Sequence, residues 1–285
     1  MNYYCLIAGL PDIEFEDNKL LFTIANFKEE VRPQLSKKDA KLLDLFYMKF
    51  DNQNLLGYLS NKEAIWDERG NLSKEDLKGC LQLINEDLTI ENPACPAYFQ
   101  SFVQEYKQVH HKPVEAALWE DRLAGIYYQW AMNCGNKFIS SWFEYNLNLN
   151  NILTAYTCRK YQVEVKPVGD NEVAESIKTS NQRDFGLTGT LEDFVRFQHL
   201  ADIPDLFERE RKTDLLKWQW LDEQTFYKFF SIEKLFAYLI KLEMIERWTQ
   251  LDPVEGERVF RELIDRLKAE STKARKHERD EMIEL

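Results

Sequence analysis

The sequence has few of the residues that interrupt helices. Its 285 residues include only ten glycines and eight prolines, whereas leucine, glutamate and lysine, which favour helices, are abundant. Long apolar runs are also missing, because no window reaches the roughly 18 consecutive apolar residues that a membrane-spanning helix needs. These absences predict an all-α, mainly helical protein with little sheet, and any contact with a membrane would have to be peripheral.

Cysteine and histidine are scarce as well. The five cysteines are odd in number and scattered, none lies in a C-x-x-C pair, and the opening MNYYCLIAGLPD does not read as a signal peptide. This pattern predicts reduced, mostly buried thiols in a cytosolic protein. With four histidines, no H-E-x-x-H and no glycine-rich phosphate loop, we expect no metal, no cofactor and no catalytic residues.

An excess of basic charge is absent too. Lysine and arginine number 37 against 49 aspartates and glutamates, which leaves a net charge of −12. A chain of this charge repels phosphate backbones, and no basic run interleaved with aromatic residues offsets the repulsion. Nucleic acid is therefore not an expected partner.

Helix signals are what the sequence does contain. Ser73 with Asp76, and Thr190 with Asp193, each place a short acceptor side chain three residues before a carboxylate and ahead of an apolar run, which predicts a helix start. Asp252 and Pro253 open a last helix that is expected to run to the C-terminus. Its second half is almost wholly charged, so we expect that half to project.

A few stretches depart from the helical pattern. The opening YYCLIAGLPDIEF predicts a strand or an extended plug, and YQVEVKPV a short strand. Residues 166–190, with three glycines and a proline among polar residues, form the strongest candidate linker. In LLKWQW, Trp218 and Trp220 cannot share one helix face, which predicts that one of them is exposed at a contact surface.

An internal repeat is suggested by three segments that align without gaps, 46–63, 143–160 and 226–243. Each begins with phenylalanine, carries an apolar residue four positions later, and then has a residue of the N-capping type, Asp51, Asn148 or Ser231. Each unit is expected to be helix, capped corner, helix. Because any capped amphipathic helix gives a similar apolar pattern, chance agreement among unrelated helices stays open.

The first two segments share a further motif, in FDNQNLLGYLSNKEA and NLNLNNILTAYTCRKY. It resembles the recurring Asp-x-x-Asn-Leu helix start, followed by a basic residue, of the C-subunit family of A- and V-type ATP synthases (called the d-subunit in eukaryotic V-ATPases). The second copy has asparagine in place of the aspartate. The matching residues are Asp51, Asn54, Leu55 and Lys62 in the first copy, and Asn148, Asn151 and Arg159 in the second.

The third segment and the N-terminus extend this resemblance. FSIEKLFAYLIKLEMIERW is similar to the closing motif of the C-subunit family, an Ala-Tyr-Leu helix that continues into a Lys/Glu-rich turn. Arg247-Trp248-Thr249 departs from it, since the family usually has asparagine, a basic residue and an aliphatic one there. YYCLIAGLPDI looks like the opening of an uncharacterised bacterial family encoded with V-type ATPase subunits.

The resemblance implies three pseudo-repeated helical units that form a funnel or socket. We expect the units at 1–95, 96–186 (with the linker) and 187–252, followed by a C-terminal helix at 253–285. It further implies a non-catalytic coupling subunit that links the central stalk of a V/A-type ATPase to its membrane rotor ring, at the cytoplasmic face of the membrane. The expected interface lies at Glu243, Glu246, Arg247 and Trp248.

Two other interpretations stay open. An all-helical adaptor or assembly protein would dock partners through its acidic face and its C-terminal helix. An enzyme would need a deep pocket with converging titratable groups, built from different helices.

Overall fold

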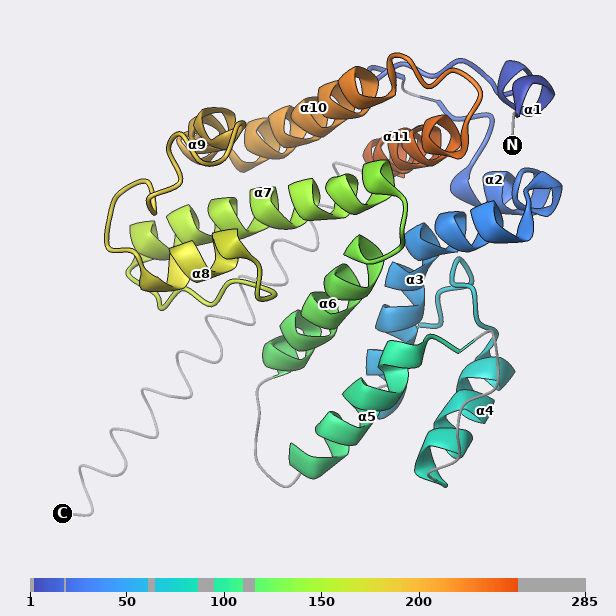
Figure 1. The fold of residues 1–285 in the computed structure, drawn as a ribbon, viewed down its shortest axis with the longest axis horizontal. Coiled ribbons are helices and arrows are strands. Elements are labelled where there is room, and N and C mark those ends of the chain that lie inside the picture. The colour runs from blue at the N-terminus through green and yellow to red at the C-terminus, as the bar shows by residue number, and fades with distance from the viewer. Residues whose placement is uncertain (1–2, 18, 61–64, 87–94, 110–115, 251–285) are drawn as a thin grey trace.

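The computed structural model describes residues 3–17, 19–60, 65–86, 95–109 and 116–250. Every regular element in these ranges is a helix, so the predicted all-α fold is confirmed (Figure 1). None of the described helices is long and apolar enough to cross a membrane. The helices are α1 (Tyr4–Ala8), α2 (Ile24–Glu30), the 3-10 turn η1 (Arg32–Gln34), α3 (Lys37–Leu59), α4 (Lys74–Asn85), α5 (Ala97–Val109), α6 (Ala116–Met132), α7 (Lys137–Tyr161), α8 (Glu172–Thr179), α9 (Phe194–Ala201), α10 (Leu206–Thr225) and α11 (Ile232–Gln250).

The two stretches predicted as extended or as strands form no strand. The opening segment forms the short helix α1 and not a strand, and YQVEVKPV forms no strand after α7. A strand needs a neighbouring strand to bind its backbone groups, and neither segment has one, whereas α1 satisfies them locally, with the Ile7 amide donating to the Tyr3 carbonyl. The predicted linker 166–190 contains α8, which packs on α7.

Of the two predicted helix caps, one is confirmed and one is wrong. Ser73 begins α4 with a complete capping box, in which its hydroxyl accepts from the Asp76 amide and Asp76 binds back. Thr190 does not cap α9, because its hydroxyl donates to the Gly186 carbonyl, and α9 begins only after Asp193. The predicted helix at 253–285 lies outside the described residues. All five cysteines are free thiols, but only Cys80 and Cys95 are buried, so the prediction that most of them are buried is wrong.

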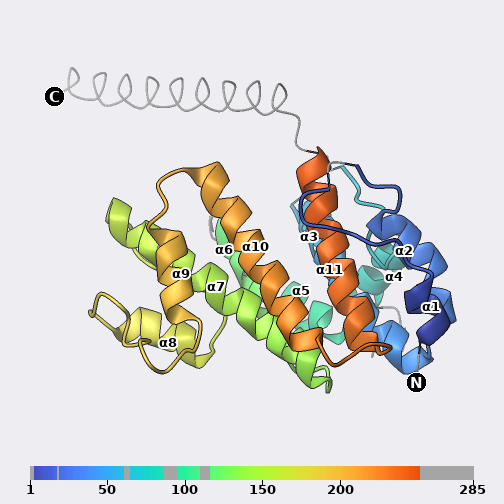
Figure 2. The same cartoon turned by 90° about the horizontal axis from the view of Figure 1, so that it is seen from above.

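The helices pack around a central element, α11. It contacts α10 and α7 on one side and α2 and α3 on the other (Figure 2). The long helices α6 and α7 form the most extensive pair, and α6 also packs on α3 and α5. Segments from the beginning, middle and end of the chain therefore meet around one interior.

Both tryptophans of α10 lie in this interior, so the prediction that one is exposed is wrong. Trp220 packs against α7, with its ring 4.9 Å from that of Tyr145. Trp218 faces the other way, where the ring of Phe15 lies 5.6 Å from it and the Lys241 ammonium lies 4.4 Å from its centre. Opposite faces of α10 are covered by different parts of the chain, which the local pattern does not reveal.

Candidate functional site

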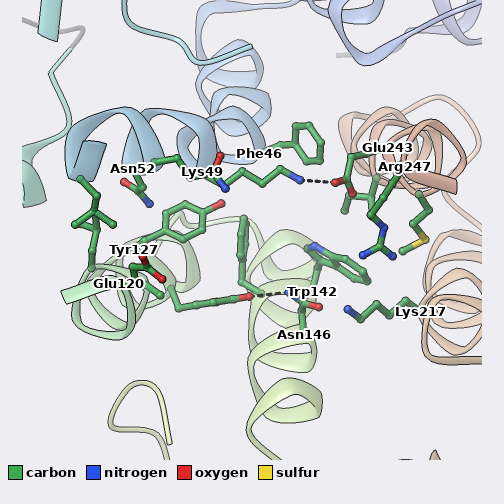
Figure 3. A pocket seen from close by; sticks show the side chains of 18 of the residues that line it. Phe46, Lys49, Asn52, Glu120, Tyr127, Trp142, Asn146, Lys217, Glu243 and Arg247 are labelled. Atoms are coloured by element: carbon green, nitrogen blue, oxygen red, sulfur yellow. Dashed lines mark hydrogen bonds and ion pairs between the residues drawn. The ribbon is translucent and has the colours of Figure 1, made fainter. Parts of the chain in front are cut away.

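A cavity of about 930 Å³ lies between α3, α6, α7, α10 and α11, and Tyr106 of α5 also lines it (Figure 3). A volume of this size is at the upper end of the range in which proteins hold small molecules, and it can also receive side chains of a partner. The five helices come from all three parts of the chain, so the cavity exists only when those parts are assembled. One side of it is mainly aromatic, with the single carboxylate Glu120, and the other carries most of the charged groups.

The aromatic side is built on α6 and α7. The Tyr127 hydroxyl donates to the Leu45 carbonyl at 2.7 Å, and the Asn146 amide donates to the Tyr128 hydroxyl at 2.7 Å. Burial raises the pKa of both tyrosines, so both hydroxyls stay protonated at neutral pH. These bonds hold the rings in place and make this wall a fixed, mainly apolar surface.

The charged side lies where α3, α10 and α11 meet. The Lys49 ammonium pairs with the Glu243 carboxylate at 2.9 Å, and Arg247 pairs with the buried Asp214. Lys217 points into the same space (Figure 3), and its ammonium has no ion pair within 4.0 Å among the described residues. Burial lowers the pKa of Lys217, which its neighbour Asp214 opposes. Each of these two ion pairs is neutral as a whole, so Lys217 adds a positive charge on this side of the cavity, and Glu120 adds a negative charge on the side of α6.

The four residues predicted as an interface join α11 to its neighbours. Glu243 and Arg247 face the cavity. Glu246 instead accepts the Ile24 amide at 2.9 Å and so holds the start of α2. The Trp248 indole donates to Asp214 at 2.8 Å. Only Glu243 and Arg247 are therefore placed to meet a molecule in the cavity.

The wall formed by α3 is held by two buried polar side chains. The Asn54 amide group donates to the Asp67 carbonyl and accepts the Asp67 amide, both at 2.9 Å. One turn earlier, Asp51 accepts the amides of Asn71 and Leu72, both at 3.0 Å. Together they bind the connection between α3 and α4 to the side of α3. We call such a pair of buried side chains, here Asp51 with Asn54 and on α7 Asn148 with Asn151, a clamp.

The same contacts recur on α7. Asn151 donates to the Val168 carbonyl at 2.8 Å and accepts the Val168 amide at 2.9 Å, and Asn148 accepts from the Asn171 side chain at 2.7 Å. Asn171 in turn caps α8. The Arg159 guanidinium donates to backbone carbonyls beyond α8, including that of Gln182 at 2.6 Å. Its predicted counterpart Lys62 lies outside the described residues.

These contacts correct the expected helix, corner, helix unit. Helices α3 and α7 run unbroken through Asp51 and Asn148, because these side chains bind a later connection and not the start of their own helix. Ser231 directly precedes α11, and its hydroxyl donates to the Lys228 carbonyl at 3.5 Å. The segments 46–63 and 143–160 thus make the same type of contact with the connection that follows their helix, and the segment 226–243 does not.

The sequence signal for the clamps was the pair of Asp/Asn residues three apart inside a strongly apolar helix. Asp51 and Asn54 are buried, as are Asn148 and Asn151. Buried polar groups need hydrogen-bond partners, so this spacing indicates that backbone from elsewhere in the chain covers that face. It does not reveal which backbone.

The burial of Asp51 should make the stability of the protein depend on pH. Burial raises the pKa of its carboxyl to about 6, against the ordinary value of 3.8, although the amides of Leu72 and Asn71 and the charge of Lys28 oppose the shift. Between these two pH values the folded protein holds a proton that the unfolded chain has released. The contribution of this carboxyl to stability is therefore greatest below pH 4 and falls as the pH rises through 6.

We expect the Asp51→Asn variant to lose this pH dependence. Relative to the variant, the wild type should lose roughly 2–3 kcal/mol of unfolding free energy from pH 4 to pH 7, as measured by urea unfolding at each pH. Glu75→Gln, at an exposed position on α4, serves as the control. A difference between wild type and the Asp51 variant that stays constant with pH would contradict the expected shift.

Comparison with known proteins adds a family. Residues 1–271 match the family model described as "Protein of unknown function (DUF2764)". The chain belongs to this family. No curated protein and no solved structure gives a significant match. Within the described residues, no three His, Cys, Asp or Glu side chains are grouped so that they could hold a metal ion.

Proposed function

We propose that this member of the DUF2764 family is a non-catalytic coupling subunit of a V/A-type ATPase, which links the central stalk to the membrane rotor ring. The observation that carries the proposal is the central cavity. It lies between helices from the beginning, middle and end of the chain, as a socket for the end of another protein of the complex would. The sequence resemblance to the C-subunit family supplies the identity of the partners.

The chemistry of the cavity supports a protein occupant. Aromatic rings fixed by hydrogen bonds form one wall, and two ion pairs and Lys217 form the other. Aromatic anchors beside a few charged groups are typical of the centres of protein interfaces. A helix end that carries apolar side chains and one carboxylate would fit both walls.

The two clamps support a mechanical role. A protein that transmits torque needs walls that do not yield, and α3 and α7 each bind their following connection through a buried asparagine. These bonds join long helices to distant backbone, so each wall moves as one body. A coupling role depends on such rigidity and requires no reacting group, so the hydrogen bonds of Asn54 and Asn151 support the proposal.

Co-expression tests the proposal. The full chain, tagged and expressed with the subunits of a V/A-type ATPase, should co-purify with the central stalk or the rotor ring. An intact complex that hydrolyses ATP and pumps ions, and that contains no copy of this chain, would contradict it.

A second candidate is a pocket for a small anionic molecule, favoured by Lys217. Its ammonium is left without an ion pair among the described residues inside a cavity of suitable size. A bound carboxylate or phosphate should then raise the melting temperature of the wild type but not of Lys217→Met. If no anion in such a panel stabilises the protein, this candidate fails, and the socket proposal is unaffected.

A further inference from the structure

One end of the molecule exposes a cluster of aromatic rings. Four of its members lie in the connection between α10 and α11, and the fifth lies on α1. We call these five residues the aromatic end, and their exposed fractions are 59% for Tyr4, 63% for Phe226, 84% for Tyr227, 59% for Phe229 and 37% for Phe230. Single exposed apolar residues are common on proteins, but five aromatic rings together mark a surface that contacts something.

The aromatic end rests on a well-supported base. The Tyr3 amide donates to the Phe230 carbonyl at 2.8 Å, and the Tyr4 ring lies 4.8 Å from the Phe230 ring. The Tyr3 hydroxyl also donates to Asp39 at the start of α3, at 2.5 Å. Figure 2 places α1 beside the α10–α11 connection. The connection that carries four of the rings is therefore bound to the start of α1, and through Tyr3 to the start of α3.

Four lysines belong to the segments at this end of the molecule. Lys37, Lys38 and Lys137 are exposed where α3 and α7 begin and have no ion pair within 4.0 Å among the described residues, whereas Lys228, in the aromatic segment, pairs with Glu233 at 3.8 Å. A shallow cavity lined by Lys38, Asn136 and Ser231, among others, shows that the starts of α3, α7 and α11 adjoin one another.

Carboxylates also lie at this end, and hydrogen bonds from neutral groups do not cancel their charge. Asp39 accepts from the Tyr3 and Ser36 hydroxyls, and Glu233 accepts from Asn136 at 2.9 Å. Glu223, exposed near the end of α10, is the nearest additional carboxylate in sequence. The N-termini of α3, α7 and α11 add partial positive charge here. Three lysines without an ion pair among the described residues, Lys37, Lys38 and Lys137, thus stand against Asp39 and Glu223, so this end does not share the acidic balance of a chain of net charge −12.

We propose that the aromatic end binds the surface of a membrane that contains anionic lipids. Tyrosine and phenylalanine rings insert at the boundary between head groups and acyl chains, and neighbouring lysines bind the negatively charged head groups. Exposed rings near three lysines that have no ion pair among the described residues match such a surface in both apolarity and charge. The proposal stands on this geometry alone and does not depend on the coupling role.

Vesicle flotation tests the proposal on the isolated full chain. The protein should float with vesicles made of equal parts phosphatidylcholine and phosphatidylglycerol, and much less with phosphatidylcholine alone. For the double variant Tyr227→Ala/Phe229→Ala, the partition coefficient onto the anionic vesicles should fall by a factor of about ten or more. Lys37→Glu/Lys38→Glu should lower binding to a similar degree at low salt, and this loss should diminish at high salt.

Leu206→Ala is the matched control. Leu206 is 61% exposed and begins α10, at the end of that helix opposite the aromatic segment, so this variant should bind like the wild type. Absence of flotation with anionic vesicles would overturn the proposal. So would equal binding by the Tyr227/Phe229 variant, or a self-association in light scattering that this variant abolishes, since the rings would then cover a second copy. None of these outcomes bears on co-purification with ATPase subunits.

Discussion

Replacing Asn151 with alanine should lower the free energy of unfolding by about 2–4 kcal/mol, and Asn54→Ala should have an effect of similar size. Each asparagine is buried and binds both the amide and the carbonyl of one distant residue, Val168 or Asp67. Alanine leaves that amide and carbonyl without a partner in a partly buried site. Chemical denaturation followed by circular dichroism measures the loss.

Gln53→Ala provides the control, because Gln53 is the exposed neighbour of Asn54 on the same helix. It should change the free energy of unfolding by no more than about 0.5 kcal/mol. If Asn54→Ala and Asn151→Ala were as mild as this control, the clamps would be dispensable, and rigidity of the walls could not explain a mechanical role.

Filling the cavity should abolish capture of the proposed partner while leaving the fold intact. Ala124 lies on α6 and lines the cavity without being fully buried, so the indole of Ala124→Trp would project into the space that the partner needs. We expect binding of the central stalk to weaken about 100-fold or more, as is usual when the anchor of an interface is lost. Co-purification and biolayer interferometry with the isolated stalk protein measure the change.

Gly79→Trp is the matched small-to-tryptophan control. A Cβ at Gly79, on the exposed face of α4, meets no atom within 4 Å. Both variants should melt within a few degrees of the wild type. If Ala124→Trp bound the stalk as well as Gly79→Trp does, the cavity would not be the socket.

The sequence predicted what local physics decides. The helical fold follows from composition and periodicity, and the Ser73 capping box follows from four consecutive residues. Thr190 does not cap a helix, because its hydroxyl donates to the carbonyl of Gly186 in the preceding turn. Local signals of this kind depend on backbone geometry that a neighbouring turn can change.

What the sequence could not predict depends on contacts between distant segments. The pairing of Asn54 with Asp67 and of Lys49 with Glu243 joins residues whose proximity only the packed fold decides. The burial of both Trp218 and Trp220 required cover from two different parts of the chain. The third aligned segment kept the apolar spacing but not the contacts, since apolar spacing records burial and not the partner that provides it.

Photo-crosslinking from the cavity wall tests the coupling proposal most directly. A photoreactive residue at Gln53, which lines the cavity, would be introduced into the full chain assembled with V/A-type ATPase subunits, with the exposed position Lys78 on α4 as the comparison. We predict a crosslink from position 53 to a central-stalk protein and none from position 78. No stalk crosslink from position 53 in an assembled, ATP-hydrolysing complex would contradict the proposal.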